Sequence, residues 1–323
     1  MGNKASFGFI KTQKTVYANG ETIFGEFCLK CHEDMHAQRI LLKVTGVEVA
    51  EWEEMQNNAM RQYRGSQIII DYSEVLYRVP YDNMPKGDYI FPFAIELPFD
   101  IPSSTSFNYP RLNGRIQYMM DIYLEGTDIK ASADIKVVNS KYDEPVLSEA
   151  YSKLKGCLWI ERGEVYLRGK PSKSMCTSAE NLRVFVDFDI SKSSWNIANI
   201  DISIVQIISV NSGDKKYIRR QAVYSKNIPT PGQQFGIDLP IRDISPDARD
   251  AFSCAGRVIE VAYSVEINGV MDSIFSVYGE EPQIIMWFSL NPPDHPPEIP
   301  KCTFSWKPTV QEMGKRTSIP IFR

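Results

Sequence analysis

Alternation of apolar and polar residues is the pattern that most limits how this chain can fold. Segment after segment has the period of two that half-buried β-strands require, and helical periods are nearly absent. Gly, Pro, Asn and Asp separate the segments, as turns demand. The sequence therefore predicts an all-β protein of packed antiparallel sheets. The predicted strands span residues 23–29, 39–49, 67–72, 88–97, 115–124, 129–138, 163–167, 182–190, 200–210, 217–224, 235–239, 257–267 and 283–288.

The length of 323 residues suits two domains better than one. We predict two tandem immunoglobulin-like β-sandwiches, at residues 1–140 and 156–289. The connector between them, residues 141–155, is polar and carries a proline but no alternation. Residues 290–323 are predicted to be a proline-containing tail, because the run NPPDHPPEIP cannot join a central strand. Two P-x-x-P matches in that run suit either a polyproline-reading partner or a plain disordered tail.

Charge and cysteine usage narrow the function classes. The formal net charge is −4, which argues against a general nucleic-acid binder because phosphate neutralisation normally needs a basic surface. The sequence has no apolar run of the roughly 18 residues needed to cross a bilayer, and its first residues lack the apolar core of a secretory signal. The six cysteines are scattered through a long chain, so we expect reduced thiols and a cytosolic protein.

Four motifs in the first half occur in the order known from one protein family. They are VYANGETIFG at residues 16–25, ILLKVTG at 40–46, YIFPFAIELP at 89–98 followed shortly by IPSS, and GRIQY at 114–118. The Asn-Gly pair of the first motif suits the positive φ of a tight hairpin. This half resembles the arrestin clan, in particular its short, alpha-arrestin-like members.

The second half carries fainter parallels in the same order. They are GEVYL at residues 163–167, WNIANI at 195–200 and the segment 257–267. The resemblance to arrestins, which runs from about residue 7 to 288, implies an elongated pair of sandwiches joined at a shallow waist. It also implies a non-enzymatic adaptor that binds cytosolic parts of membrane proteins in trafficking or signalling, at the plasma membrane or endosomes. Sorting or ubiquitin-ligase machinery would then be a further partner.

The chain departs from the family at three points. The stretch between Leu239 and Arg257 is too short for the long loop that supplies the buried polar core of receptor-silencing arrestins, and we expect a short helix at residues 245–252 within it. Lys136 lies where the arginine of that core would be expected. The tail has no PPxY sequence, which weakens a ligase-adaptor role. An arrestin-fold subunit of a retromer-like sorting coat is therefore kept as an alternative.

The segment from Trp52 to Gly65 occupies the place of the central crest loop that engages cargo in the family. We expect a long loop with a short helix at residues 51–63. The cargo-contact candidates in it are Trp52, Met55, Met60 and Tyr63, apolar side chains among charges. The alternative is a mobile strand connection without a partner.

The N-terminus Met1-Gly2-Asn3-Lys4-Ala5-Ser6 fits the M-G-x-x-x-[ST] acceptor pattern for N-myristoylation at Gly2. One myristoyl chain holds a membrane only marginally, so a second contact with an anionic membrane surface is expected. Candidate cations for this contact lie in a first twenty residues without an acidic group, at Lys4, Lys11 and Lys14.

A second basic cluster contains Lys215, Lys216, Arg219 and Arg220. Its functional interpretation is contact with anionic lipid or a phosphorylated tail. The alternative is an edge strand protected by cations against unwanted pairing, and strand alternation would divide the cluster between two faces.

The sequence Cys28-Leu29-Lys30-Cys31-His32, with His36 beyond it, raises haem attachment, zinc binding or redox chemistry. Haem attachment needs a different compartment. Zinc or redox use of Cys28, Cys31 and His36 is an alternative of another class, although cysteines three apart on a strand point to opposite faces. We expect reduced thiols, exposed histidines, no metal and no cofactor. With only three histidines and no catalytic motif in the chain, we expect a protein that is not an enzyme.

Overall fold

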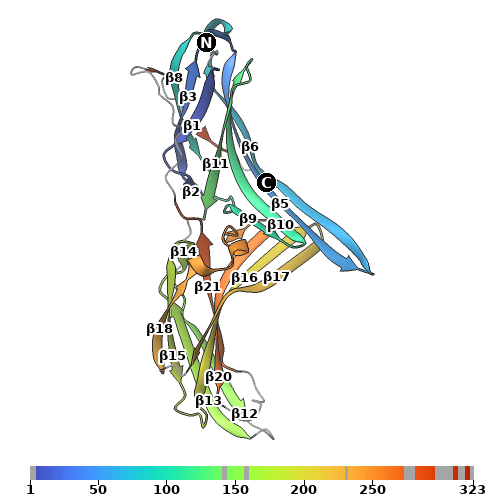
Figure 1. Ribbon diagram of the computed structural model, residues 1–323, viewed down its shortest axis with the longest axis vertical. Coiled ribbons are helices and arrows are strands. Elements are labelled where there is room, and N and C mark those ends of the chain that lie inside the picture. The colour runs from blue at the N-terminus through green and yellow to red at the C-terminus, as the bar shows by residue number, and fades with distance from the viewer. Residues whose placement is uncertain are drawn as a thin grey trace.

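A computed structural model describes residues 5–139, 144–155, 160–229, 232–272, 281–294, 308–311 and 317–320. These residues form two β-sandwiches stacked end to end along the long axis of the molecule (Figure 1). They contain strands and short 3₁₀ turns but no α-helix. The predicted all-β, two-sandwich fold is confirmed.

Two sheets form the first sandwich. One has the order β1-β3-β8-β22, in which β22 (Thr309–Val310) comes from the C-terminal part of the chain, and the other has the order β2-β11-β10-β5-β6, with β9 pairing β10. A two-stranded sheet of β4 and β7 lies at the far end of this domain. The elements are β1 (Phe7–Thr12), β2 (Val16–Ala18), β3 (Thr22–Cys31), β4 (Met35–His36), β5 (Arg39–Gln56), β6 (Ala59–Arg78), η1 (Pro80–Asp82), β7 (Asn83–Met84), β8 (Gly87–Glu96), β9 (Thr105–Tyr109), β10 (Leu112–Glu125) and β11 (Lys130–Val138).

The second sandwich repeats this plan. Its sheets have the orders β12-β13-β15-β18 and β14-β21-β20-β16-β17, with β19 pairing β20. The elements are β12 (Ser148–Lys155), β13 (Glu161–Pro171), β14 (Met175–Thr177), β15 (Asn181–Asp189), β16 (Ile197–Ser212), β17 (Lys215–Pro229), β18 (Gln234–Pro240), η3 (Ile241–Asp243), η4 (Pro246–Ala248), β19 (Cys254–Ala255), β20 (Ile259–Met271) and β21 (Gln283–Asn291).

A short strand near the start of each sandwich, β2 or β14, shows the repeat in atomic detail. β2 pairs in parallel with β11, and β14 pairs in parallel with β21. In the first domain the Glu21 carboxylate accepts the Ala18 N–H (2.9 Å) and bridges Lys14 (2.5 Å). In the second, Glu180 accepts the Thr177 N–H (2.7 Å) and bridges Lys173 (2.8 Å). The two domains thus share this strand arrangement, including the turn that follows β2 and β14.

Strand alternation produces the core, as the sequence predicts. Along β5 every second side chain from Ile40 to Trp52 is buried, and along β16 every second side chain from Ile200 to Val210 is buried. Most of the buried apolar residues of both sandwiches belong to one connected cluster, and Leu154, Val165 and Met271 form a small second one. Burial of apolar surface at about 25 cal/mol per Å² therefore holds the domains together as well as folding each of them.

The helix predicted at residues 51–63 is wrong. These residues form the outer part of a β-hairpin in which β5 and β6 pair from Arg39↔Arg78 to Gln56↔Ala59. The turn residues Asn57 and Asn58 have φ of 50° and 62°, the type I′ combination that matches the right-handed twist of a hairpin. Asparagine tolerates this backbone region, so the Asn-Asn pair is the local cause of the turn.

Three other segments differ from the sequence-based expectation. Within the predicted connector, residues 148–155 form the edge strand β12, and the predicted helix at 245–252 is only the 3₁₀ turn η4. Parts of the predicted tail return to the first domain as β22 (Thr309–Val310) and β23 (Thr317–Ser318), both parallel to β8. They cover an edge that would otherwise leave backbone groups unpaired. The two P-x-x-P matches extend beyond the described residues.

Candidate partner-binding surfaces at the domain junction

Two long hairpins, β5–β6 and β16–β17, leave their sandwiches at the waist and approach each other there (Figure 1). The Ser212 hydroxyl, at the end of β16, donates to the Arg64 carbonyl on β6 (2.7 Å). Gly65, the next residue, is buried, and a Cβ on it would collide with the Asn211 carbonyl oxygen. The close approach of the two hairpins therefore requires a glycine at position 65.

A buried carboxylate joins the two domains. Glu48, on β5, is only 1% exposed, and its oxygens accept the backbone N–H groups of Arg257 (3.2 Å), Val258 (2.9 Å) and Ile259 (2.6 Å) at the start of β20. Burial raises the pKa of the Glu48 carboxyl, more than its three N–H donors lower it. Gly256 leaves the space that the carboxylate fills.

A second polar network crosses the junction beside the first. The Tyr109 hydroxyl, from β9, donates to Gln206 Oε1 (2.6 Å), and Gln206 Nε2 donates to the Tyr263 hydroxyl (2.6 Å). Tyr263 donates in turn to the Ala251 carbonyl (2.7 Å). Gln206 is fully buried. These satisfied groups fix how the sandwiches meet, because any other alignment would leave buried donors without acceptors.

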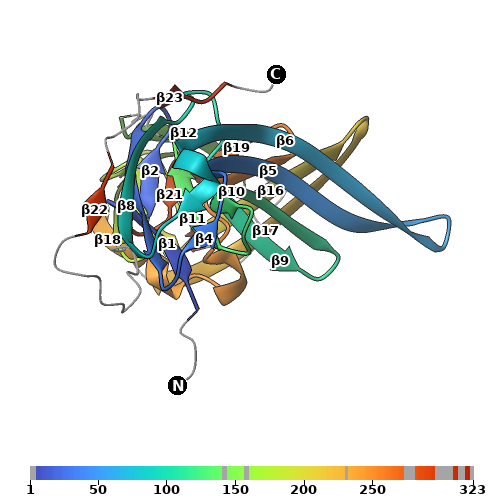
Figure 2. The ribbon, with the colours of Figure 1, turned by 90° about the horizontal axis from the view of Figure 1, so that it is seen from above.

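The outer part of the β5–β6 hairpin projects well beyond the body of the molecule (Figure 2). Of the four cargo-contact candidates, Trp52 is buried and stacks on the half-buried Tyr63 ring, with centroids 5.4 Å apart. Met55 and Met60 lie directly opposite each other near the tip and are 64% and 42% exposed. The structure thus divides the predicted set into an aromatic anchor at the base and two exposed methionines at the tip.

A cavity of about 490 Å³ lies beside the base of this hairpin, next to the β9–β10 turn. It is lined by residues 51–53 and 62–64 of the hairpin and by Asn108, Tyr109 and residues 111–113. The Glu53 N–H donates to the Arg111 carbonyl (3.0 Å), so the turn holds the base of the hairpin. Its tip makes no described contact with the second domain.

The second basic cluster lies on β17, an edge strand, and the strand divides it between two faces as expected from alternation. The Arg219 guanidinium lies 4.3 Å above the Tyr109 ring, so it packs into the domain junction. Arg220 points to the other face and pairs with the buried carboxylate of Glu266. Lys215 and Lys216, at the hairpin turn, are exposed. Arg220 is exposed as well, but Lys215 and Lys216 are the members of the predicted cluster without an ion pair or ring contact among the described residues.

The N-terminal lysines predicted to contact a membrane do not form one cluster among the described residues. Lys11, on β1, pairs with Glu26 (3.5 Å), and Lys14 pairs with Glu21 and lies 5.2 Å from the Tyr17 ring centroid. Gly2 and Lys4 lie outside the described residues. Ser6, the last residue of the myristoylation pattern, accepts the His32 N–H (2.9 Å). The start of β1 therefore lies at the end of the first domain away from the waist (Figure 1).

The predicted zinc or redox residues do not form a site within the described part of the chain. Cys28 and Cys31 are both buried, while His36 is exposed. Burial, with the nearby Asp88 charge, raises the pKa of the Cys31 thiol to about 11, which opposes formation of the thiolate that binds metals. Among the described residues there is no group of three His, Cys, Asp or Glu side chains placed to hold a metal ion.

Lys136, the residue at the expected position of the family's core arginine, lies 5.9 Å from the Phe252 ring centroid. Glu48 and Gln206, whose side chains form the buried hydrogen bonds of the junction described above, were missed by sequence analysis. A signal for both was present. Glu48 and Gln206 are polar residues on the apolar face of long strands, between Val44 and Trp52 and between Ile204 and Ile208.

These observations define a two-domain β-sandwich protein with candidate contact surfaces at the hairpin tip and the domain junction. Residues 7–142 match the family model of the arrestin (or S-antigen) N-terminal domain. The first domain is therefore similar to the N-terminal domain of arrestins. A sequence comparison with curated proteins gave no match. Within the described residues, no helix is long and apolar enough to span a membrane.

Proposed function

We propose that this protein is a non-enzymatic, alpha-arrestin-like adaptor that binds cytosolic parts of membrane proteins while resting on a membrane surface. The observation that carries the proposal is the projecting β5–β6 hairpin, whose tip presents Met55 and Met60 as a pair. Methionine is flexible and polarizable, and it is over-used at surfaces that accept varied partners. The Trp52–Tyr63 stack at the base stiffens the hairpin and so lowers the cost of ordering it on binding.

The double substitution Met55→Ser/Met60→Ser is expected to lower the fraction of the protein that sediments with cell membranes by at least about threefold, because exposed apolar anchors commonly contribute over 1 kcal/mol each. Stability is expected to stay within about 0.5 kcal/mol, since both side chains are exposed. Phe185→Ser is the matched control, because Phe185 is 50% exposed on β15 of the other domain. Equal membrane fractions for the double variant and wild type would count against the hairpin as the contact.

Gly2→Ala tests the membrane anchor independently. With an N-myristoyltransferase present, the wild-type mass is expected to rise by one myristoyl group and the Gly2→Ala mass to stay unchanged. Cosedimentation with anionic liposomes is expected to fall for Gly2→Ala. Lys215→Gln/Lys216→Gln is expected to lower liposome binding less, because each lysine that reaches the anionic membrane surface contributes about 1 kcal/mol to binding. An unmodified wild-type mass would remove the acyl anchor from the proposal.

A further inference from the structure

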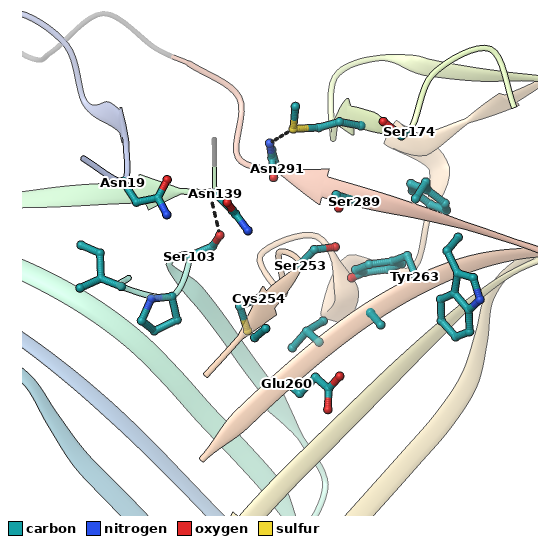
Figure 3. A pocket seen from close by; sticks show the side chains of 18 of the residues that line it. Asn19, Ser103, Asn139, Ser174, Ser253, Cys254, Glu260, Tyr263, Ser289 and Asn291 are labelled. Carbon is teal, nitrogen blue, oxygen red and sulfur yellow. Dashed lines mark hydrogen bonds between the residues drawn. The ribbon is translucent and has the colours of Figure 1, made fainter. Parts of the chain in front are cut away.

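A groove at the waist is independent of the hairpin tip and has its own chemistry. It has a volume of about 790 Å³ and lies between the loop 99–103 of the first domain and strands β20 and β21 of the second (Figure 3). The lining also includes Asn139, just after β11, the connector residues Glu144, Val146 and Ser148, and residues 253–255 around β19. The volume is within the range of about 300–1,000 Å³ found for ligand sites.

The ionisable charges of this groove all have one sign. They belong to Asp100, Glu144 and Glu260, which are exposed, and no Lys or Arg is present among the described residues of the lining. Among the ion pairs of the described residues, none involves these three carboxylates, whereas Glu21, Glu26 and Glu51 each pair with a cation. A concave site lined by charges of one sign concentrates the field and attracts ligands of the opposite sign. The groove is therefore complementary to a cationic partner.

Apolar side chains lie among these carboxylates. Trp287, Phe99 and Val146 line the groove and are 57%, 68% and 74% exposed. Exposed apolar groups next to a concave surface mark contact sites, and an indole face also attracts Lys and Arg side chains. The remaining lining is rich in hydroxyl and amide groups, which suit the backbone of an extended peptide; those labelled in Figure 3 are Asn19, Ser103, Asn139, Ser174, Ser253, Ser289 and Asn291.

We propose that the waist groove binds an extended peptide segment in which lysines and arginines flank an apolar side chain. Cytosolic segments next to membrane spans are enriched in lysine and arginine, so this inference rests on the proposed function and names the kind of segment that the adaptor would select. The three carboxylates pair with the flanking cations, and Trp287 contacts the apolar side chain. The same carboxylates repel a phosphorylated or acidic segment, which the groove therefore excludes.

Fluorescence anisotropy with the full chain tests this proposal. The probe is a labelled peptide of one leucine and one phenylalanine with three lysines or arginines on each side, and its counterpart carries glutamates in place of the cations. Binding of the cationic probe is expected to weaken by about tenfold for Asp100→Asn/Glu260→Gln, and by about tenfold for Trp287→Ala. Raising the salt from 0.05 to 0.5 M is expected to weaken it further.

Glu33→Gln/Asp128→Asn is the matched control, because it removes the same charge from two exposed residues near the far end of the first domain. This variant is expected to bind as wild type does. The proposal is overturned if wild type does not bind the cationic probe, if it binds the glutamate counterpart equally well, or if the groove variants bind like the control. Such a failure would leave the membrane-sedimentation test of the hairpin unaffected, so the two outcomes are distinguishable.

Discussion

Replacing Glu48 with alanine is expected to lower the free energy of unfolding by about 3–5 kcal/mol, because three buried N–H groups would lose their acceptor. Glu51→Ala, on the same strand, is the matched control. Glu51 is half-buried and pairs with Arg64 at 3.3 Å, so its loss is expected to cost under about 1 kcal/mol. Urea unfolding followed by tryptophan fluorescence measures the free energy of unfolding of both variants. Equal losses for the two would contradict a stabilising role for the three hydrogen bonds to Glu48.

The pH dependence of Glu48→Gln gives a second readout of the same carboxyl. Because burial raises its pKa above the usual 4.5, the folded protein binds this proton more tightly than the unfolded chain does. The contribution of the group to stability is thus complete below the unfolded-state pKa and is lost as the pH rises through the folded pKa. Glutamine does not titrate, so the free-energy advantage of wild type over Glu48→Gln is expected to grow as the pH falls from 7 towards 5. An advantage that shrinks over this interval would contradict the raised pKa.

Gln206→Leu is expected to cost about 2–4 kcal/mol, because the Tyr109 hydroxyl would lose its acceptor in the buried junction. The double variant Tyr109→Phe/Gln206→Leu removes both partners and is expected to be more stable than the sum of the single losses predicts, by about 1 kcal/mol or more. A thermodynamic cycle from urea unfolding measures this coupling. Strict additivity would show that the two side chains do not interact in solution.

These junction variants address whether the two sandwiches act as one unit. The apolar core is continuous across the waist, and Glu48 and Gln206 add polar contacts that only one alignment satisfies. A fixed alignment keeps the hairpin tip and the waist groove at a constant separation. An adaptor of this kind can therefore offer two surfaces to one membrane protein, which raises the effective concentration of the second contact after the first has formed.

The strands of the core could be predicted from sequence because their signal is local. Along residues 39–49 and 200–210 the alternation of side chains reports which face is buried, and both segments are central strands. The arrestin resemblance rested on turn and strand motifs within residues 16–118, and the family match covers this part of the chain. Within residues 16–118, the strands predicted from alternation and the family match therefore lie in the same part of the chain.

The projecting hairpin was misjudged for a local reason. The apolar residues Trp52, Met55, Met60 and Tyr63 are three to five positions apart, a spacing compatible with a helix. The Asn57-Asn58 pair was the better signal, because two consecutive asparagines suit the left-handed conformations of a hairpin turn. The repeated turn of the two domains, Lys14 with Glu21 and Lys173 with Glu180, was also present in the sequence but not recognised.

The junction and the groove could not be predicted, because they depend on contacts between distant segments. Glu48 meets a backbone N–H that lies 210 residues further along the chain. The three carboxylates of the groove come from a loop of the first domain, the connector and β20. Strand alternation indicates which face a side chain takes, but it does not indicate which other segment faces it.

Site-specific photo-crosslinking tests directly whether the tip of the β5–β6 hairpin contacts membrane proteins. A photoreactive amino acid is placed at position 55 at the hairpin tip, and at position 185 as the exposed control. After irradiation of intact cells, the crosslinked products are sorted into integral membrane proteins and others. Position 55 is expected to yield crosslinks to cytosolic segments of integral membrane proteins, and position 185 is not. Crosslinks from position 55 to soluble proteins alone would contradict this expectation.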